Sequence, residues 1–346
     1  MQNKIKIAQM GLGHWGQNLL RNFIRNPRAE VVALCDQNID NLQPVCDVLP
    51  SARRYKSIDE LLSDTNVDAV SIATPSGQHF EHTQAIIRSG KDVFVEKPMT
   101  LSLEDAVSLA QTAAHEDKLV MVGHTYLYNA IVERVKDYIR SGELGDVYYA
   151  YSQRLNLGKF RQDSDVIWTL APHDISMFNY WFDSRPHQVS ARTLSYVGEK
   201  QQHAEICFAQ LDYPNEVSLH LHLSWVDPQK IRKSVIAGSQ KMLVYDDVDQ
   251  TQPIKIYDRS MELDEIISGR AAGYNVTKRA GDVFIPNVST AEPLYLELDH
   301  FIDCMLGLAQ CKTDVTQGLE VTTIMDALSR SALEDGEVTP VDYHDL

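Results

Sequence analysis

The sequence has few cysteines, no long apolar run and no excess of positive charge, and each shortage excludes a class of protein. The five cysteines are odd in number and include no C-x-x-C pair, which predicts reduced, mostly buried thiols and excludes a disulfide framework. No apolar run reaches the length of a transmembrane helix, and the first residues include no apolar segment typical of a signal peptide. We therefore expect a soluble, cytoplasmic protein with no membrane partner.

Basic residues are outnumbered, with 32 Lys and Arg against 48 Asp and Glu, and the formal net charge is −16. Nucleic acids and anionic membranes require a basic surface, so neither is an expected partner. A local arginine cluster could still bind an anionic small molecule. The chain is 44% hydrophobic and 23% charged, as in ordinary globular proteins, and its 346 residues exceed what one core usually holds. We expect two domains.

Three of the 17 glycines lie within the first sixteen residues, where residues 4–16 read KIKIAQMGLGHWG. An apolar run precedes these glycines and an amphipathic run follows, which predicts a strand, a tight turn and a helix. Gly11, Gly13 and Gly16 have the G-x-G-x-x-G spacing. In this motif the first glycine makes the turn, the second lets a pyrophosphate approach and the third lets the helix pack on the strand. The free N–H groups at the helix N-terminus would bind the phosphates.

The next predicted strand, residues 30–36, ends in Asp36, twenty residues after Gly16. A carboxylate at this spacing accepts hydrogen bonds from ribose hydroxyls. The residues that follow include no arginine to neutralise a 2′-phosphate. Together these features predict a dinucleotide site that favours NAD(H) over NADP(H).

The first third of the chain alternates β-branched apolar runs with helical patterns, which is typical of a parallel sheet covered on both faces. We expect a doubly wound Rossmann domain over residues 1–124. Its predicted strands are residues 5–10, 30–36, a short strand near 54, 68–73, 92–96 and 119–123. Its predicted helices follow the glycines, cover residues 37–49, begin after Ser57, cover residues 80–89 and begin after Ser102.

Residues 125–346 predict a second α/β domain whose sheet is largely antiparallel, because its segments alternate apolar and polar residues. Residues 218–225, SLHLHLSW, show this alternation most clearly. The predicted strands are residues 147–155, 189–197, 204–213, 216–225, 234–237 and 242–245, and the predicted helices are residues 130–141, 294–308 and 320–335. Residues 258–293 are the least periodic, so we expect a long loop or excursion there. The final helix is expected to pack on the first domain.

Glu96, Lys97 and Pro98 follow the fifth strand of the predicted parallel sheet. Ligands bind such sheets beyond the carboxyl ends of the strands, which places this tripeptide beside the cofactor. Pro98 restricts the residue before it, so Lys97 is aimed in one direction. A partly desolvated lysine can exchange a proton with a hydroxyl, whereas a lysine at a strand end is otherwise simply solvated.

Thr74 and Pro75 end the fourth strand, where small polar residues suit the edge of a dinucleotide. His79 lies on the following turn and is interpreted as a positioning or capping residue, not as a catalyst.

Residues 166–177, VIWTLAPHDISM, contain the second catalytic candidate. Pro172 precedes His173, which predicts a helix that begins at this histidine. The positive end of a helix dipole would keep the imidazole neutral and basic. The alternative is a structural histidine held by its neighbours.

Other polar groups are weaker candidates. Arg154, Lys159 and Arg161 bring positive charge just upstream of this helix, or else form a solvated loop. His220 and His222 could bind a metal from one strand face, but no third ligand of convincing spacing accompanies them. We expect no metal site.

These residues together resemble the Gfo/Idh/MocA family, the relatives of glucose–fructose oxidoreductase and inositol dehydrogenase. The resemblance rests on GLGHWG, Asp36, ATPSGQH, VFVEKP, the downstream histidine and EPLYLELDHFIDCM, and it covers nearly the whole chain. It implies a Rossmann domain followed by an α/β domain with a large open sheet, bound NAD(P) and reversible oxidation of a sugar or cyclitol hydroxyl. NLGKFRQDSDVIW followed by LAPHDIS is similar to the branch acting on nucleotide-linked sugars, such as UDP-N-acetylglucosaminuronate 3-dehydrogenases.

Carried over by position, the resemblance implies that Lys97 is the catalytic lysine and His173 the catalytic histidine. The family usually has an aspartate four residues before that histidine, where this chain has the uncharged Thr169. The residues expected to contact the cofactor are Gly11, Gly13, His14, Trp15, Gly16, Asp36, Thr74, Pro75, His79, Glu96 and Lys97. The residues expected to contact the substrate are Lys97, Arg154, Arg161, Trp168, Thr169 and His173.

A homodimer or homotetramer is also expected. Ser218, His220, His222 and Ser224 form one face of a predicted strand, and this face is mixed rather than strongly charged. A broad sheet with such a face suits contact with a second copy, and the resemblance points the same way.

Three functions agree with these sequence features. The leading one is an NAD-dependent oxidoreductase acting on a sugar, with a nucleotide-linked sugar favoured. The second is an NAD-binding sensor or scaffold that has lost turnover, which agrees with Thr169. The third is an enzyme that holds NAD+ tightly and uses it transiently in hydrolysis or isomerisation. NADH formation with UDP-sugars separates the first from the second, and product without net NADH would show the third.

Overall fold

The computed structural model describes residues 4–45, 47–158, 164–197, 203–268, 271–289 and 291–344, without the side chains of residues 262–277. Its residue contacts divide the chain into two compact units. The first contains Met1–Asn129, Ala291–Asp326 and Tyr343–Leu346, and the second contains Ala130–Thr290 and Ala327–Asp342. No helix in the described part of the chain is long and apolar enough to cross a membrane.

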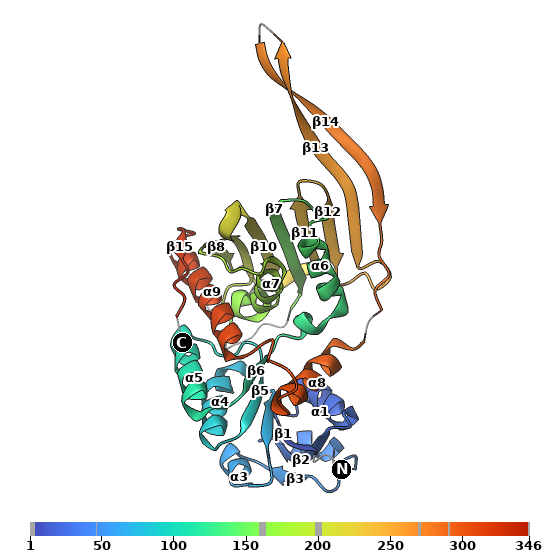
Figure 1. Cartoon of the computed structure of the whole chain (residues 1–346). Helices are drawn as coiled ribbons and strands as arrows, with labels where there is room; N and C mark the ends of the chain where they lie inside the picture. The colour runs from blue at the N-terminus through green and yellow to red at the C-terminus, as the bar shows by residue number, and fades with distance from the viewer. Residues whose placement is uncertain are drawn as a thin grey trace. The chain divides into compact units, whose positions relative to one another are not determined.

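The first unit is built on a six-stranded sheet in the order β3-β2-β1-β4-β5-β6, in which all neighbours are parallel (Figure 1). Its strands are β1 (Ile5–Met10), β2 (Ala29–Cys35), β3 (Arg53–Tyr55), β4 (Ala69–Ile72), β5 (Asp92–Glu96) and β6 (Val120–Gly123). This is the strand order of the doubly wound dinucleotide-binding fold. The predicted fold of this part is confirmed.

Two helices of the first unit begin at serine residues that cap them. Ser57 accepts a hydrogen bond from the Glu60 N–H, and Ser102 accepts one from the Asp105 N–H. The helices are α1 (His14–Arg25), α2 (Ile39–Leu42), α3 (Ile58–Leu62), α4 (His79–Arg88), α5 (Leu103–Glu116) and α8 (Pro293–Met305). Helix α9 (Val315–Leu333) is divided between the units, with residues 315–326 in the first unit and the rest in the second.

The helix expected over residues 37–49 is wrong. In the described part of this stretch α2 is the only α-helix, and a 3-10 turn at Gln43–Val45 follows it. Pro44 has no N–H to continue the α-helical hydrogen bonding.

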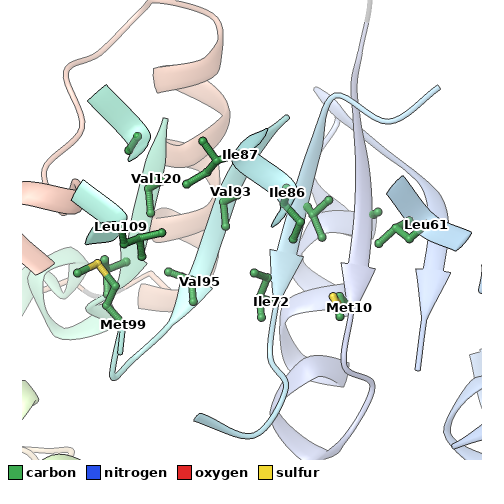
Figure 2. Close-up of a cluster of buried hydrophobic side chains, with 14 of the residues drawn as sticks. Met10, Leu61, Ile72, Ile86, Ile87, Val93, Val95, Met99, Leu109 and Val120 are labelled. Atoms are coloured by element: carbon green, nitrogen blue, oxygen red, sulfur yellow. The ribbon is translucent and has the colours of Figure 1, made fainter. Parts of the chain in front are cut away.

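A continuous apolar core fills the space between this sheet and its helices. Figure 2 shows side chains from neighbouring strands and helices pointing into it. Leu319 on α9 also belongs to this core. Burial of one such aliphatic side chain stabilises the fold by about 1.5–3 kcal/mol.

The second unit is built on a nine-stranded sheet in the order β14-β13-β12-β11-β7-β10-β9-β8-β15. Only β7 and β10 are parallel neighbours among the pairs described, so the prediction of a mainly antiparallel sheet is confirmed. The strands are β7 (Val147–Leu157), β8 (Gln188–Leu194), β9 (Ile206–Asp212), β10 (Ser218–Ser224), β11 (Val226–Gly238), β12 (Met242–Asp246), β13 (Ile254–Ser268), β14 (Ala271–Phe284) and β15 (Thr339–Pro340). Helices α6 (Ala130–Arg140) and α7 (Val166–Phe182) belong to this unit.

A long loop or excursion is the expectation for residues 258–293. A loop is wrong for the larger part, because β13 and β14 form a long antiparallel hairpin, and this hairpin is the excursion (Figure 1). β12 pairs with β13 only along residues 254–257. Beyond this point the two hairpin strands pair with each other, from Arg259↔Ala280 to Ser268↔Ala271. A ribbon paired only with itself does not have to bury one face, so the sequence lacks the two-residue apolar period of a covered strand.

Candidate functional site

The turn between β1 and α1 depends on each glycine in a different way. Gly11 has a φ of +80°, and a Cβ there would lie 2.5 Å from the Ala73 carbonyl oxygen. A Cβ at Gly16 would lie 1.9 Å from the Gly11 oxygen, whereas a Cβ at Gly13 would meet no atom within 4 Å. Gly11 and Gly16 are therefore required by the fold. Gly13 leaves open space where a pyrophosphate would approach.

The N-terminus of α1 next to this space has no capping side chain. Gly13 is the N-cap residue, and the first turn contains no acidic residue. The first backbone N–H groups of a helix have no partner within the helix, and here no side chain takes them. Together with the open space at Gly13, they form a cradle that fits a dinucleotide phosphate. His14 and Trp15, both expected cofactor contacts, are exposed on this first turn.

Asp36 follows β2 and lies against the same turn. Its carboxylate accepts hydrogen bonds from the Leu12 N–H at 2.7 Å, the Asn38 N–H at 2.8 Å and the Asn41 side-chain amide at 3.1 Å. The bond from Leu12 ties the carboxylate to the glycine turn. This is the position in which a carboxylate can reach a ribose.

His79 joins the ends of two neighbouring strands of the sheet. The buried ring lies with Nε2 2.9 Å from the Thr74 carbonyl oxygen and Nδ1 2.7 Å from the Pro98 carbonyl oxygen. Carbonyl oxygens only accept, so the ring must donate to whichever of them it binds. His79 thereby holds the segments after β4 and β5, which contain Thr74, Pro75 and Lys97. This placement supports a positioning role.

Glu96, the last residue of β5, is a buried carboxyl group beside the first turn of α1. The Trp15 indole N–H donates to its Oε1. Gly123 on β6 provides the room, since a Cβ there would lie 3.1 Å from the carboxyl group. Burial raises the pKa of Glu96, against the lowering effects of the Trp15 hydrogen bond and of Lys97.

Three further polar residues of this region were missed by the sequence reasoning. Glu297 on α8 is fully buried, and its Oε2 accepts a hydrogen bond of 2.6 Å from the Thr125 hydroxyl. Its Oε1 and the Nδ1 atom of the buried His124 have no hydrogen-bond partner among the described residues. Burial, and then the nearby Glu96, raise the pKa of Glu297 well above its usual value. Burial, and then Lys97, lower the pKa of His124 to about 3.

The sequence did contain a signal for Glu297. It lies on the apolar stripe of its helix, three residues after Leu294 and four before Phe301, which are both buried. A charged residue at such a position is rarely buried unless it has a specific role or partner.

Lys97 is half-buried directly after β5 and precedes a cis peptide bond to Pro98. The electrostatic interactions above place its ammonium group near Glu96 and His124. An amine with an adjacent carboxyl group and a neutral imidazole is equipped to take or give a proton.

The helix that contains His173 starts earlier than expected. α7 begins at Val166, where the Asp165 carboxylate caps the Ile167 N–H at 2.9 Å and the Trp168 N–H at 3.1 Å. Pro172 lies inside the helix, and His173 is about 10 Å along its axis from the N-terminus. The expectation that His173 faces the positive helix end is wrong, because the dipole effect fades within the first turn.

Arg154, an expected substrate contact, is paired inside the second unit. Its Nε lies 2.6 Å from Oδ2 of Asp174, and both side chains are buried. Ser152 donates a hydrogen bond of 2.7 Å to the other oxygen of Asp174. This network fixes α7 against β7 and therefore sets the position of His173, which adjoins Asp174.

Thr169 and His173 lie four residues apart on α7 and share one face of the helix. The Thr169 hydroxyl donates to the Asp165 carbonyl oxygen at 2.9 Å. Trp168 is half-buried on the preceding position, and the expected contact Arg161 lies outside the described residues.

The fold and this site define a dinucleotide-binding protein of the oxidoreductase class. Two family profiles match the chain, "Oxidoreductase family, NAD-binding Rossmann fold" over residues 5–124 and "GFO/IDH/MocA C-terminal domain" over residues 132–244. The chain belongs to the Gfo/Idh/MocA oxidoreductase family.

Named relatives agree with this assignment. The chain is 33% identical over 164 residues to an "Uncharacterized oxidoreductase" of Streptococcus pneumoniae. This alignment covers 47% of this chain and 43% of that protein. It is 27% identical over 256 residues to UDP-N-acetylglucosamine 3-dehydrogenase of Acidithiobacillus ferrooxidans. This alignment covers 74% of this chain and 77% of that protein. The chain spans about half the length of the first curated relatives it matches.

Among solved structures, the WlbA dehydrogenase from Bordetella pertussis in complex with NADH and UDP-GlcNAcA has a TM-score of 0.81 and 21% identity. The match covers 99% of this chain and 100% of that one. At this identity the likeness concerns the fold.

Proposed function

We propose that this protein is an NAD(H)-dependent dehydrogenase that oxidises a secondary hydroxyl of a sugar, with a nucleotide-linked sugar as the favoured substrate. The observation that carries the proposal is the pairing of an uncapped α1 N-terminus at Gly13 with the Glu96–Lys97 dipeptide at the end of β5. The first feature binds a dinucleotide, and the second supplies proton-transfer groups at the edge of the same sheet.

The residues present fit NAD(H). The open space at Gly13 and the free N–H groups of α1 would hold the pyrophosphate, and Asp36 would accept hydrogen bonds from the adenosine ribose. The same carboxylate would repel the 2′-phosphate of NADP(H). The bound nicotinamide supplies hydride transfer.

The chain's own contribution to the reaction is positioning and proton transfer. Lys97, once its ammonium group has lost a proton to solvent, would accept the proton of the substrate hydroxyl; its neighbours are the buried Glu96 carboxyl group and the neutral His124. His173 on α7, held by the Asp174–Arg154 pair next to it, is the second residue proposed for proton transfer, on the resemblance to the family. Proton transfer of this kind contributes about 10²–10⁴-fold to rate.

The proposal of a nucleotide-linked sugar rests on similarity. UDP-N-acetylglucosamine 3-dehydrogenase is among the relatives that align over most of this chain, and the WlbA structure contains UDP-GlcNAcA. Other relatives are inositol dehydrogenases, so cyclitols belong in any substrate panel.

Purified protein mixed with NAD+ and a panel of UDP-sugars, free sugars and inositols tests this function by NADH absorbance. The expected result is NADH formation with a UDP-sugar and none with the corresponding free sugar. NADH formation with inositols alone would replace the substrate and keep the activity. No product with any member, although NADH binds, would favour the sensor or scaffold, for which Thr169 in place of the family aspartate is the specific observation.

We further propose a homodimer or homotetramer that forms through one face of the second unit's sheet. Tyr149 and Tyr151 on β7 and Phe208 on β9 are exposed on this face, which also contains His220 and His222. The opposite face of the same strands is buried. Aromatic side chains exposed together on a sheet are typical of a surface that contacts another protein.

A further inference from the structure

We propose that His300, Cys304 and Cys311 form a binding site for Zn²⁺, separate from the dinucleotide site. One nitrogen and two sulfur atoms of these residues all lie within 4.8 Å of one another. All three residues belong to the first unit and are half-buried, so a cation can reach them from solvent.

The local structure explains how the three residues meet. His300 and Cys304 are four residues apart on α8, which places them on one face, one turn apart. The helix ends at Met305, and Gly307 adopts a φ of +69°. The Gly307 N–H donates to the Cys304 carbonyl and the Leu308 N–H donates to the Asp303 carbonyl, at 3.0 and 2.8 Å. This reversal after the helix brings the chain back, so that Cys311 returns to the same face.

The imidazole of His300 is oriented as a ligand. Its Nε2 accepts the backbone N–H of Lys312 at 3.1 Å and lies 3.4 Å from the Cys304 sulfur. Nε2 is therefore the ring nitrogen that carries the lone pair, and it lies on the side of the ring near the Cys304 sulfur. A backbone hydrogen bond links the ring to Gln310, and since Nε2 accepts, the donor is Nδ1–H. Histidine ligands of metals are oriented by such a bond from the other ring nitrogen to a backbone carbonyl.

The two thiols complete a donor set that suits Zn²⁺. A side-chain hydrogen bond links the Cys304 and Cys311 thiols, so the two sulfurs already lie together. Zn–S bonds of about 2.3 Å and Zn–N bonds of about 2.0–2.1 Å place tetrahedral ligand atoms roughly 3.5–3.8 Å apart. The three atoms need to move closer by about 1 Å or less to reach this geometry.

Metal binding at this site would exchange two thiol protons for one cation. Both thiols lose their protons to solvent, two thiolates and one neutral imidazole bind Zn²⁺, and a water takes the fourth position. The Lys312 N–H gives up its bond to Nε2. The Lys312 ammonium donates to the Leu127 carbonyl at 3.2 Å and lies over the Tyr128 ring. Its positive charge also acts on His300, and the negative charge of the two thiolates would offset its repulsion of the cation.

The site would stabilise a segment that packs on the Rossmann sheet. Two residues after Cys311, the Thr313 carbonyl accepts the Val122 N–H of β6 at 2.8 Å, and the Thr313 hydroxyl lies 3.0 Å from the Tyr128 hydroxyl. Zn²⁺ would thus link α8 to the strand that ends at Gly123. We therefore expect bound metal to raise the melting temperature of the whole protein.

Co²⁺ alone is the probe for the reduced, chelator-treated full-length protein. The expected result is one Co²⁺ per chain with a sulfur-to-cobalt charge-transfer band, which Zn²⁺ then abolishes by displacement. Cys304→Ser, Cys311→Ser and His300→Gln should each weaken binding at least about tenfold. Cys207→Ser in the second unit and His222→Gln on β10 are the matched controls and should bind like the wild type.

The proposal fails if reduced wild-type protein shows no charge-transfer band, or if the band persists in both serine variants. It also fails if the pair oxidises to a disulfide while the reduced form binds no Co²⁺. Circular dichroism reports whether each variant is folded, and any one folded variant of the three ligands is sufficient for the comparison. A rise in melting temperature with Zn²⁺ that is absent from the folded variant would support the site independently of activity.

Discussion

At the scale of single residues, the first unit contains two buried carboxyl groups whose environment favours the protonated form. Glu96 and Glu297 each have a raised pKa because of burial, and Glu297 is raised further by Glu96. Two buried carboxylates near one another cannot both be ionised cheaply. The pair therefore costs stability at neutral and alkaline pH, which fits a role in catalysis better than a role in folding.

Glu297→Gln tests this cost. A raised pKa in the folded state contributes stability below the unfolded pKa, and this contribution is lost as the pH rises through the folded pKa. The wild type should therefore lose stability between mildly acidic and alkaline pH, and Glu297→Gln should lose less. Each pKa unit corresponds to about 1.4 kcal/mol. Melting temperatures measured across this range provide the comparison.

Glu292→Gln is the matched control. The pKa of Glu292 is shifted in the opposite direction from that of Glu297, so its replacement should change stability in the opposite sense. Partial burial raises the pKa of Glu292, but hydrogen bonds from Asn22 and Arg25 and the charges of Arg21 and Arg25 outweigh it. The pKa of Glu292 is therefore lowered. Its replacement should reduce stability above the unfolded pKa of a glutamate. A stabilising Glu292→Gln, or a Glu297→Gln that loses as much stability at alkaline pH as the wild type, would contradict this electrostatic description.

At the scale of elements, the turn into α1 separates fold from function. Gly13→Ala adds a Cβ in open space, so the folded protein should keep its melting temperature while NADH affinity falls at least about tenfold. Gly16→Ala adds a Cβ 1.9 Å from the Gly11 oxygen and should destabilise the fold itself. Fluorescence titration with NADH and thermal melts distinguish the two. Unchanged NADH affinity in Gly13→Ala would show that this turn does not bind the pyrophosphate.

The pair that fixes α7 provides a second prediction for an element. Asp174→Asn leaves the buried Arg154 without a counter-charge, which costs about 3–5 kcal/mol in comparable buried pairs. Asp335→Asn removes the partner of Arg192 at the surface and should change stability by less than about 0.5 kcal/mol. Urea unfolding of both variants measures the difference. Equal stabilities would mean that the Arg154–Asp174 pair does not hold the helix.

The sequence predicted these elements well where a periodic pattern coincided with a cap or a breaker. The strand ending at Glu96 has the predicted bounds, and the Ser102 cap places α5 correctly. The prediction failed at α7, because Pro172 suggests a helix start, whereas the helix is capped by Asp165, about two turns upstream. It also failed to find Glu297, since only the folded chain brings α8 beside Thr125 and near Glu96.

At the scale of the whole molecule, the exposed aromatic face of the second unit's sheet predicts self-association. Tyr149→Glu combined with Tyr151→Glu puts two charges at the centre of this face and should yield a monomer. Tyr196→Glu, at an exposed position outside the strands, is the control and should keep the wild-type mass. Light scattering at micromolar concentration measures both. A wild-type protein that is already monomeric would overturn the proposed assembly.

The most direct test of the proposed function is NADH formation by the wild type and by Lys97→Met, with NAD+ and the UDP-sugar that the panel selects. Lys56→Met, an exposed lysine of the same unit, is the control. We predict that Lys97→Met lowers turnover by about 10²–10⁴-fold while NADH affinity and melting temperature stay close to those of the wild type. Turnover by Lys97→Met equal to that of the wild type and of Lys56→Met would contradict the account of Lys97 as the residue that takes the substrate's proton.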